Sequence, residues 1–199
     1  MAGERYALLI ASSEYQNESL QRLSAPPADV EALSDVLRRS NLGRFEVKTL
    51  VNQPRAIVEL AIQEFFLERK REDLVLLYFS GHGLKNDSNN LYFAMTDTRR
   101  RYLEATAVSS RFVHEMMQNS SARQQIVLLD CCFSGAFPRG CTFRADETIG
   151  SGQYFDVKGT GQAILTASDD MQYAFEGGRN YLGEGHSFHI YRDCSRRNC

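Results

Sequence analysis

The sequence predicts a single α/β domain, spanning residues 1–199, with a mainly parallel central sheet of about six strands and helices on both faces. Two apolar runs, at residues 74–79 and 126–129, are short and continuous, as strands buried on both faces of a sheet are. Segments with apolar residues at helical spacing separate the strand-like runs. This alternation is typical of a parallel sheet with helical crossovers, and the chain is long enough for one sizeable core.

The N-terminal part supplies two strands and two helices. Residues 6–11 are apolar and predict the first strand, whereas residues 45–50 alternate apolar and polar side chains, as a half-buried strand does. Between them, Ser24 is expected to cap a helix that has two prolines in its first turn. Asn52 is expected to cap a second helix, whose apolar face extends to Phe66.

The middle of the chain continues the same pattern. Residues 84–90 are polar and predict a loop, and residues 91–95 predict a short strand or hairpin arm. Ser109 or Ser110 can cap a third helix, which leads into the buried strand at residues 126–130.

The bulk composition argues against several classes of protein. A net charge of -2 gives no basis for a nucleic-acid partner, and no apolar stretch approaches the roughly 18 residues that span a bilayer. The first residues lack the basic and apolar regions of a signal peptide. Five cysteines, without a Cys-x-x-Cys pair, argue against a disulfide framework and a structural zinc site. We therefore expect a cytoplasmic protein in a reducing compartment, with no membrane partner.

Two of the predicted strands end in groups suited to nucleophilic catalysis. Residues 80–83 read Ser-Gly-His-Gly, and residues 130–135 read Asp-Cys-Cys-Phe-Ser-Gly. The carboxyl ends of parallel strands meet at one edge of a sheet, where ligands bind. A thiol attacks as the thiolate and needs a base, for which His82 is the candidate. A single histidine between glycines is more often a turn residue, and a single buried cysteine is more often an inert thiol. Their occurrence together, at the ends of two strands, favours a catalytic pair.

These two blocks resemble the signature blocks of the caspase-like cysteine peptidases, and are most similar to the metacaspase and bacterial caspase-homologue branch. His82 and Cys132 have the separation of about 50 residues that caspases show. Aligned on Asp-x-Cys-x-Ser-Gly, the nucleophile is Cys132, and Cys131 is a small buried residue. The resemblance implies the caspase-like fold, hydrolysis of protein or peptide substrates, and an oxyanion hole made by the backbone N–H groups of Gly83 and Cys132.

The same resemblance implies a specificity pocket. True caspases bind aspartate before the scissile bond with arginines, whereas metacaspases and bacterial homologues often bind Arg or Lys there with acids. The matching positions in this sequence are Asp29, Ser80 and Asp130. Two carboxylates favour a cation, so we expect cleavage after Arg or Lys. As an alternative to a role in this pocket, Asp29 would only complement the dipole of its helix, and Asp130 would only cap the turn that follows it.

By resemblance, residues 1–138 correspond to a large subunit, residues 139–160 to a flexible linker and residues 161–199 to a small subunit. The linker carries Arg139, Arg144 and Lys158, where an enzyme specific for basic residues can process its own zymogen. The end of the chain has no sustained helical periodicity, so we expect the small subunit to be truncated or altered.

Some metacaspases need calcium, and Asp97 matches one of their ligand positions. The acid pair expected further along the chain is absent, because residues 106–109 read Thr-Ala-Val-Ser. Calcium takes six to eight oxygen ligands, so we expect neither a required metal nor another cofactor.

Two classes of function remain. The first is a cysteine endopeptidase, which the intact His82 and Cys132 favour. The second is a caspase-like interaction module that does not cleave, or cleaves only with a partner, which the altered C-terminal part favours. Cleavage after aspartate is a weaker third reading, since no arginine matches that pocket. Caspases dimerise through the last strand of the small subunit and metacaspases are typically monomers, so the sequence is compatible with both states.

Overall fold

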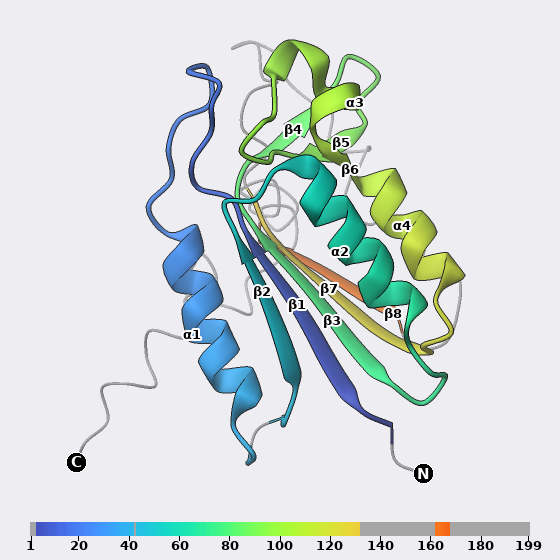
Figure 1. The fold of residues 1–199 in the computed structure, drawn as a ribbon. Coiled ribbons are helices and arrows are strands. Elements are labelled where there is room, and N and C mark those ends of the chain that lie inside the picture. The colour runs from blue at the N-terminus through green and yellow to red at the C-terminus, as the bar shows by residue number, and fades with distance from the viewer. Residues whose placement is uncertain (1–2, 42, 132–161, 168–199) are drawn as a thin grey trace, which may run out of the picture.

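The computed structural model describes residues 3–41, 43–131 and 162–167. Its centre is a parallel sheet in the order β2-β1-β3-β7-β8 (Figure 1). The predicted α/β class and mainly parallel sheet are confirmed, and the described residues form five strands of this sheet. The strands are β1 (Arg5–Ala11), β2 (Glu46–Val51), β3 (Leu74–Ser80), β7 (Gln124–Asp130) and β8 (Gln162–Ala167).

Helices cover both faces of the sheet, as predicted. Helix α1 (Pro26–Arg38) packs on one face, whereas α2 (Arg55–Leu67) and α4 (Ser110–Asn119) pack on the other (Figure 1). Successive side chains of a strand point to opposite faces, so each central strand contributes to two cores. In β1, Leu9 belongs to the core beneath α1 and Leu8 to the core beneath α2 and α4. No helix in the described ranges has the length and apolar character needed to cross a membrane.

The carboxyl ends of the strands are level with one another. Ala11 lies opposite Val51 and Ser80, Ser80 lies opposite Asp130, and Asp130 lies opposite Ala167. The carboxyl ends of the five strands therefore lie along one line. We call this line the carboxyl edge; it is where open α/β sheets bind ligands.

A smaller antiparallel sheet of three strands lies beyond the carboxyl edge (Figure 1). It consists of β4 (Gly83–Lys85), β5 (Leu91–Phe93) and β6 (Val108–Ser109), and β5 and β6 are connected through the 3-10 turn η1 (Arg100–Tyr102) and α3 (Leu103–Thr106). The hairpin arm predicted at residues 91–95 is confirmed as β5. The loop predicted at residues 84–90 is wrong at its start, because pairing with β5 holds the first of these residues in β4.

Two of the predicted helix caps are wrong. Helix α1 starts one residue later than a cap at Ser24 requires, and no side chain caps it. The side chain of Asn52 instead accepts the backbone N–H of Ser13 at 2.8 Å. Helix α2 is capped from a distant loop, since Oδ1 of Asp97 accepts the backbone N–H of Arg55 at 2.8 Å. Sequence spacing alone does not reveal such tertiary caps.

The third predicted cap, Ser109, is confirmed and gives a test of the fold. Its hydroxyl accepts the backbone N–H of Phe112 at 3.1 Å at the start of α4. We expect Ser109→Ala to lower the free energy of unfolding by about 1 kcal/mol, because an orphan N–H loses its partner. Urea denaturation followed by circular dichroism measures this change. Ser88→Ala, in an exposed turn, is the control, and an equal effect of both changes would contradict the role of the cap.

Candidate active site

His82 lies just past the end of β3, where the backbone itself fixes its position. A Cβ atom on Gly81 would lie 2.8 Å from the ring of Phe79 and 2.9 Å from the carbonyl oxygen of Ser12, so the turn requires glycine. The backbone N–H of Gly81 donates to the carbonyl of Asp130 at 3.3 Å. These contacts hold the start of the turn against the ends of both neighbouring strands.

The imidazole of His82 is oriented by the segment that follows β1. Its Nε2 atom lies 2.7 Å from the carbonyl oxygen of Gln21. A carbonyl oxygen only accepts hydrogen bonds, so Nε2 carries a proton and Nδ1 is the basic nitrogen of the neutral ring. The half-buried ring packs against the ring of Tyr15, with the centroids 5.0 Å apart. The arrangement defines which nitrogen can take a proton from a nucleophile.

The two cysteines after β7 differ in what the structure describes. Cys131 is buried, with an exposed fraction of 3%, and packs with Phe79 and Leu129 in the core beneath α2 and α4. This confirms the expectation that it is a small buried residue. Cys132, the predicted nucleophile, lies outside the described residues. The predicted processing sites Arg139, Arg144 and Lys158 lie outside them as well.

The three predicted specificity residues gather around the phenol of Tyr78 on the α1 side of the carboxyl edge. The hydroxyl of Tyr78 donates to Oδ2 of Asp130 at 3.2 Å. Ser80 lies two residues further along β3 and therefore faces the same side of the sheet. Asp29 lies in the first turn of α1, where its charge also suits the helix dipole. Asp29, Ser80 and Asp130 thus all influence the Tyr78 phenol, and their role in binding a substrate stays a prediction.

Electrostatics support this grouping. Burial raises the pKa of Tyr78 well above its usual range, and the negative charge of Asp130 raises it further. The charge of Asp29 also raises the pKa of Tyr78, whereas a hydrogen bond with Ser80 lowers it. The phenol therefore remains protonated and a donor at neutral pH. We call Asp29, Tyr78, Ser80 and Asp130 the acidic cluster, which contains two carboxylates and two hydroxyl groups.

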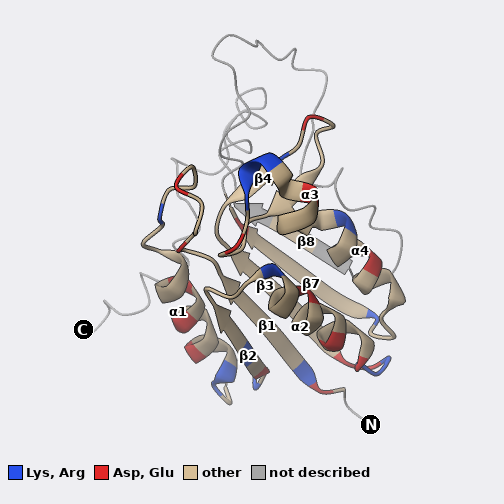
Figure 2. Ribbon diagram, turned by 45° about the horizontal axis from the view of Figure 1, so that its top comes forward, with Lys and Arg blue, Asp and Glu red and all other residues tan. Residues whose placement is uncertain are grey.

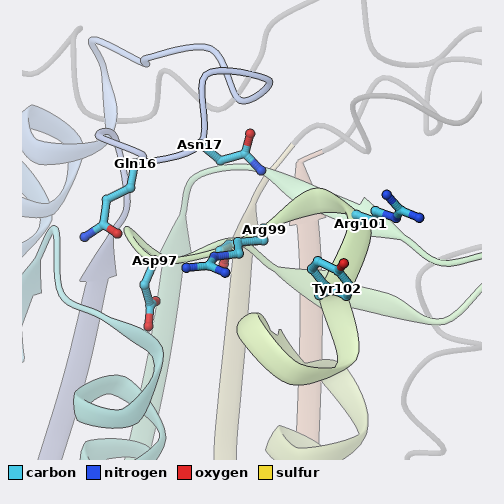
Figure 3. Close-up of a pocket in the computed structure, with 7 residues that line it drawn as sticks. Gln16, Asn17, Asp97, Arg99, Arg101 and Tyr102 are labelled. Carbon is cyan, nitrogen blue, oxygen red and sulfur yellow. The ribbon is translucent and has the colours of Figure 1, made fainter.

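Asp97, the calcium candidate, has another role in the structure, since its carboxylate caps α2. It also lines a depression of about 390 Å³, in which Arg99 lies between Asp97 and Tyr102 (Figure 3). Three arginines, at residues 99–101, lie in the segment ahead of α3 (Figure 2). The guanidinium groups of Arg99 and Arg101 would repel a cation here. Among the described residues, no three His, Cys, Asp or Glu side chains are grouped so that they could hold a metal ion.

The predictions from sequence missed two aromatic residues of the site. Tyr78 was assigned only to a buried strand, although its place two residues before Ser80 puts both on one face of the sheet. Tyr15 lies between β1 and α1, in a segment whose sequence has no periodic apolar pattern. A single aromatic residue in such a segment indicates a packing contact, but the composition of the segment does not predict the residue that it contacts. Gly83, the predicted oxyanion donor, is the first residue of β4, directly after His82.

Comparison with known proteins identifies relatives by sequence. A family model described as the caspase domain matches residues 4–185. The human mucosa-associated lymphoid tissue lymphoma translocation protein 1 is 28% identical over 132 residues, which are 66% of this chain and 15% of that protein. Its mouse homologue shows the same identity and coverage. The matching segment is thus a small part of these relatives.

Solved structures show the same fold. Protein GSU0716 from Geobacter sulfurreducens aligns with a TM-score of 0.53 and 21% identity, over 66% of this chain and 52% of that one. The structure of pro-sf-caspase-1 aligns with a TM-score of 0.52 and 18% identity, over 83% of this chain and 60% of that one.

Proposed function

The chain belongs to the caspase domain family, and we propose that it is a cysteine endopeptidase that cleaves after Arg or Lys with Cys132 as nucleophile and His82 as base. Family membership supports a cysteine peptidase acting on protein substrates. The proposal for catalysis and specificity depends on the carboxyl edge, where the oriented imidazole of His82 follows β3 and the carboxylates of α1 and β7 interact with Tyr78 of the same strand. Placement in the metacaspase branch remains a prediction.

The proposed reaction follows from the tautomer of His82. The Nε2 proton is directed at the Gln21 carbonyl, so Nδ1 accepts the proton of the Cys132 thiol. The thiolate attacks the peptide carbonyl, and the backbone N–H groups of Gly83 and Cys132 stabilise the oxyanion. His82 then gives its proton to the leaving amine, and an acyl-enzyme forms. Water, deprotonated by the same nitrogen, hydrolyses the thioester and restores the thiol.

The specificity proposal rests on the acidic cluster. Tyr78 donates to Oδ2 of Asp130, and an ionised carboxylate can accept several hydrogen bonds at once. Asp29 adds a second negative charge from α1. A guanidinium group can bind a carboxylate through two parallel hydrogen bonds, whereas an ammonium group acts as a point charge. We therefore expect Arg to be preferred over Lys, with both cleaved.

The proposal includes self-processing at Arg139, Arg144 or Lys158, because these basic residues lie in the predicted linker between residues 139 and 160. It includes no required calcium or other cofactor, since Asp97 already caps α2 beside two arginines. The odd number of cysteines supports a reducing, cytoplasmic location. The alternative is a caspase-like interaction module without activity, which the aperiodic sequence of residues 188–199 favours.

A panel of fluorogenic peptides tests the proposal. We expect turnover of peptides with Arg or Lys before the scissile bond, no turnover of the Asp peptide, and loss of turnover in Cys132→Ser by at least about 1,000-fold. Activity should be the same in EDTA and in added calcium. Mass spectrometry of the purified protein should show cleavage in the linker of the wild type and not of Cys132→Ser. Turnover of the Asp peptide alone would contradict the acidic pocket, and no turnover with any peptide would favour the interaction module.

A further inference from the structure

We propose that Tyr15 is a positioning residue of this enzyme, whose side chain holds His82 in its catalytic orientation. The inference rests on the proposed peptidase function and adds a residue to it. The phenol oxygen of Tyr15 joins two backbone segments at the carboxyl edge. It donates to the carbonyl of Ser12 at 2.6 Å and accepts the backbone N–H of His82 at 3.2 Å.

The aromatic ring of Tyr15 adds a second contact with the same histidine. The two ring centroids are 5.0 Å apart and the planes are inclined by 34°. The ring therefore limits rotation of the imidazole, while the hydroxyl holds the backbone that carries it. A misplacement of about 1 Å at a reacting group can cost about 100-fold in rate, so this restraint has catalytic consequences.

Tyr15 acts together with the carbonyl that orients the imidazole. The Gln21 carbonyl accepts from Nε2 of His82 at 2.7 Å, and both residues belong to the segment between β1 and α1. The carbonyl of His82 accepts the backbone N–H of Ala94 at 2.9 Å. The histidine is thus restrained at its backbone N–H, its carbonyl, its ring face and its Nε2 atom. Tyr15 supplies two of these four restraints.

The protonation state of Tyr15 suits this role. Burial raises the pKa of its phenol above the usual value, although the hydrogen bonds with Ser12 and with the backbone of His82 oppose the shift. The neighbouring Cys131 acts in the same direction as burial. The hydroxyl group therefore keeps its proton for the Ser12 carbonyl throughout a neutral assay range.

The substitution Tyr15→Phe removes the hydroxyl group and keeps the ring. We expect kcat for an Arg peptide to fall about tenfold, because His82 loses the acceptor of its backbone N–H and samples unproductive orientations. KM should stay within about twofold, because the hydroxyl group that is removed bonds with Ser12 and His82 and not with the acidic cluster around Tyr78. The matched control is Tyr102→Phe, the same change at an exposed residue with 55% accessibility, which should leave kcat unchanged.

A second measurement reports on the imidazole without turnover. In nitrogen-15 NMR spectra, we expect the wild-type ring of His82 to show the Nε2–H tautomer, and Tyr15→Phe to shift its ring nitrogens towards a mixture of tautomers. Assignment uses the loss of these signals in a His82→Ala protein. Tyr102→Phe should give the wild-type spectrum. Ring signals and kcat that both remain at wild-type values in Tyr15→Phe would overturn the positioning role.

The two experiments separate this inference from the proposed function. If the wild type shows no turnover but Tyr15→Phe still shifts the ring nitrogens of His82, the peptidase proposal fails and the structural restraint stands. If the wild type cleaves peptides and Tyr15→Phe changes neither the spectrum nor kcat, the peptidase stands and Tyr15 is only a packing residue. Equal losses of kcat in Tyr15→Phe and Tyr102→Phe would also overturn the inference.

Discussion

The substitution Asp130→Asn is expected to lower kcat/KM for a peptide with Arg before the scissile bond by about 100-fold. A hydrogen bond between charged partners contributes roughly 1.5–3 kcal/mol, and 2.7 kcal/mol corresponds to a factor of 100. The Asn side chain keeps the shape of the acid and an oxygen that can accept from Tyr78, whose hydroxyl lies 3.2 Å from Oδ2 of Asp130. The change therefore removes charge and leaves the packing of the acidic cluster in place.

Two comparisons make this measurement specific. A peptide with citrulline in place of Arg has nearly the same shape but no charge, so it should be a poor substrate of both the wild type and Asp130→Asn. The ratio of kcat/KM for the Arg peptide to that for the citrulline peptide should therefore be smaller in Asp130→Asn than in the wild type. Asp35→Asn removes an exposed carboxylate from α1 and is the matched control for long-range electrostatics. Equal losses in the two variants, or no loss in Asp130→Asn, would leave Asp130 only the role of capping the turn after β7.

The sequence predicted the fold well because its strongest signals are local and periodic. Continuous apolar runs placed β3 and β7, and helical spacing placed α1, α2 and α4. The order of the strands in the sheet cannot be predicted from these local patterns. β1 lies between β2 and β3, an arrangement fixed by packing of residues distant in the chain. The same limit explains the missed cap at α2, where Asp97 and Arg55 are 42 residues apart.

The family resemblance implied Asp29, Ser80 and Asp130 as pocket residues and did not include Tyr78, with which all three interact. Asp29 and Asp130 come from α1 and β7, and no spacing rule connects them. Once the register places Ser80 opposite Asp130, the alternation of side chains puts Tyr78 on the same face. The position of the Tyr15 side chain could not be predicted in this way, because the segment after β1 has no repeating geometry. Its role follows only from the hydrogen bonds that it makes.

The substitution His82→Ala is expected to lower kcat between about 100-fold and 10,000-fold, the range typical of general acid–base catalysis. KM should change little, because the acidic cluster, which we propose binds the substrate cation, faces the α1 side of the sheet and does not include the imidazole. Steady-state kinetics with an Arg peptide gives both values. The matched control is His114→Ala, in α4, which should retain wild-type kcat.

Alkylation of Cys132 shows whether the loss comes from the base. With His82 as base, iodoacetamide should modify Cys132 faster in the wild type than in His82→Ala at neutral pH, because the imidazole withdraws the thiol proton. Mass spectrometry of the peptide that contains both cysteines separates this reaction from modification of Cys131, which is buried and should stay unmodified in the folded protein. Equal alkylation rates in the two proteins, together with equal kcat, would exclude His82 as the base and move the search to another group at the carboxyl edge. A lower kcat with an unchanged alkylation rate would instead restrict His82 to protonating the leaving amine, since that step follows the attack by the thiolate.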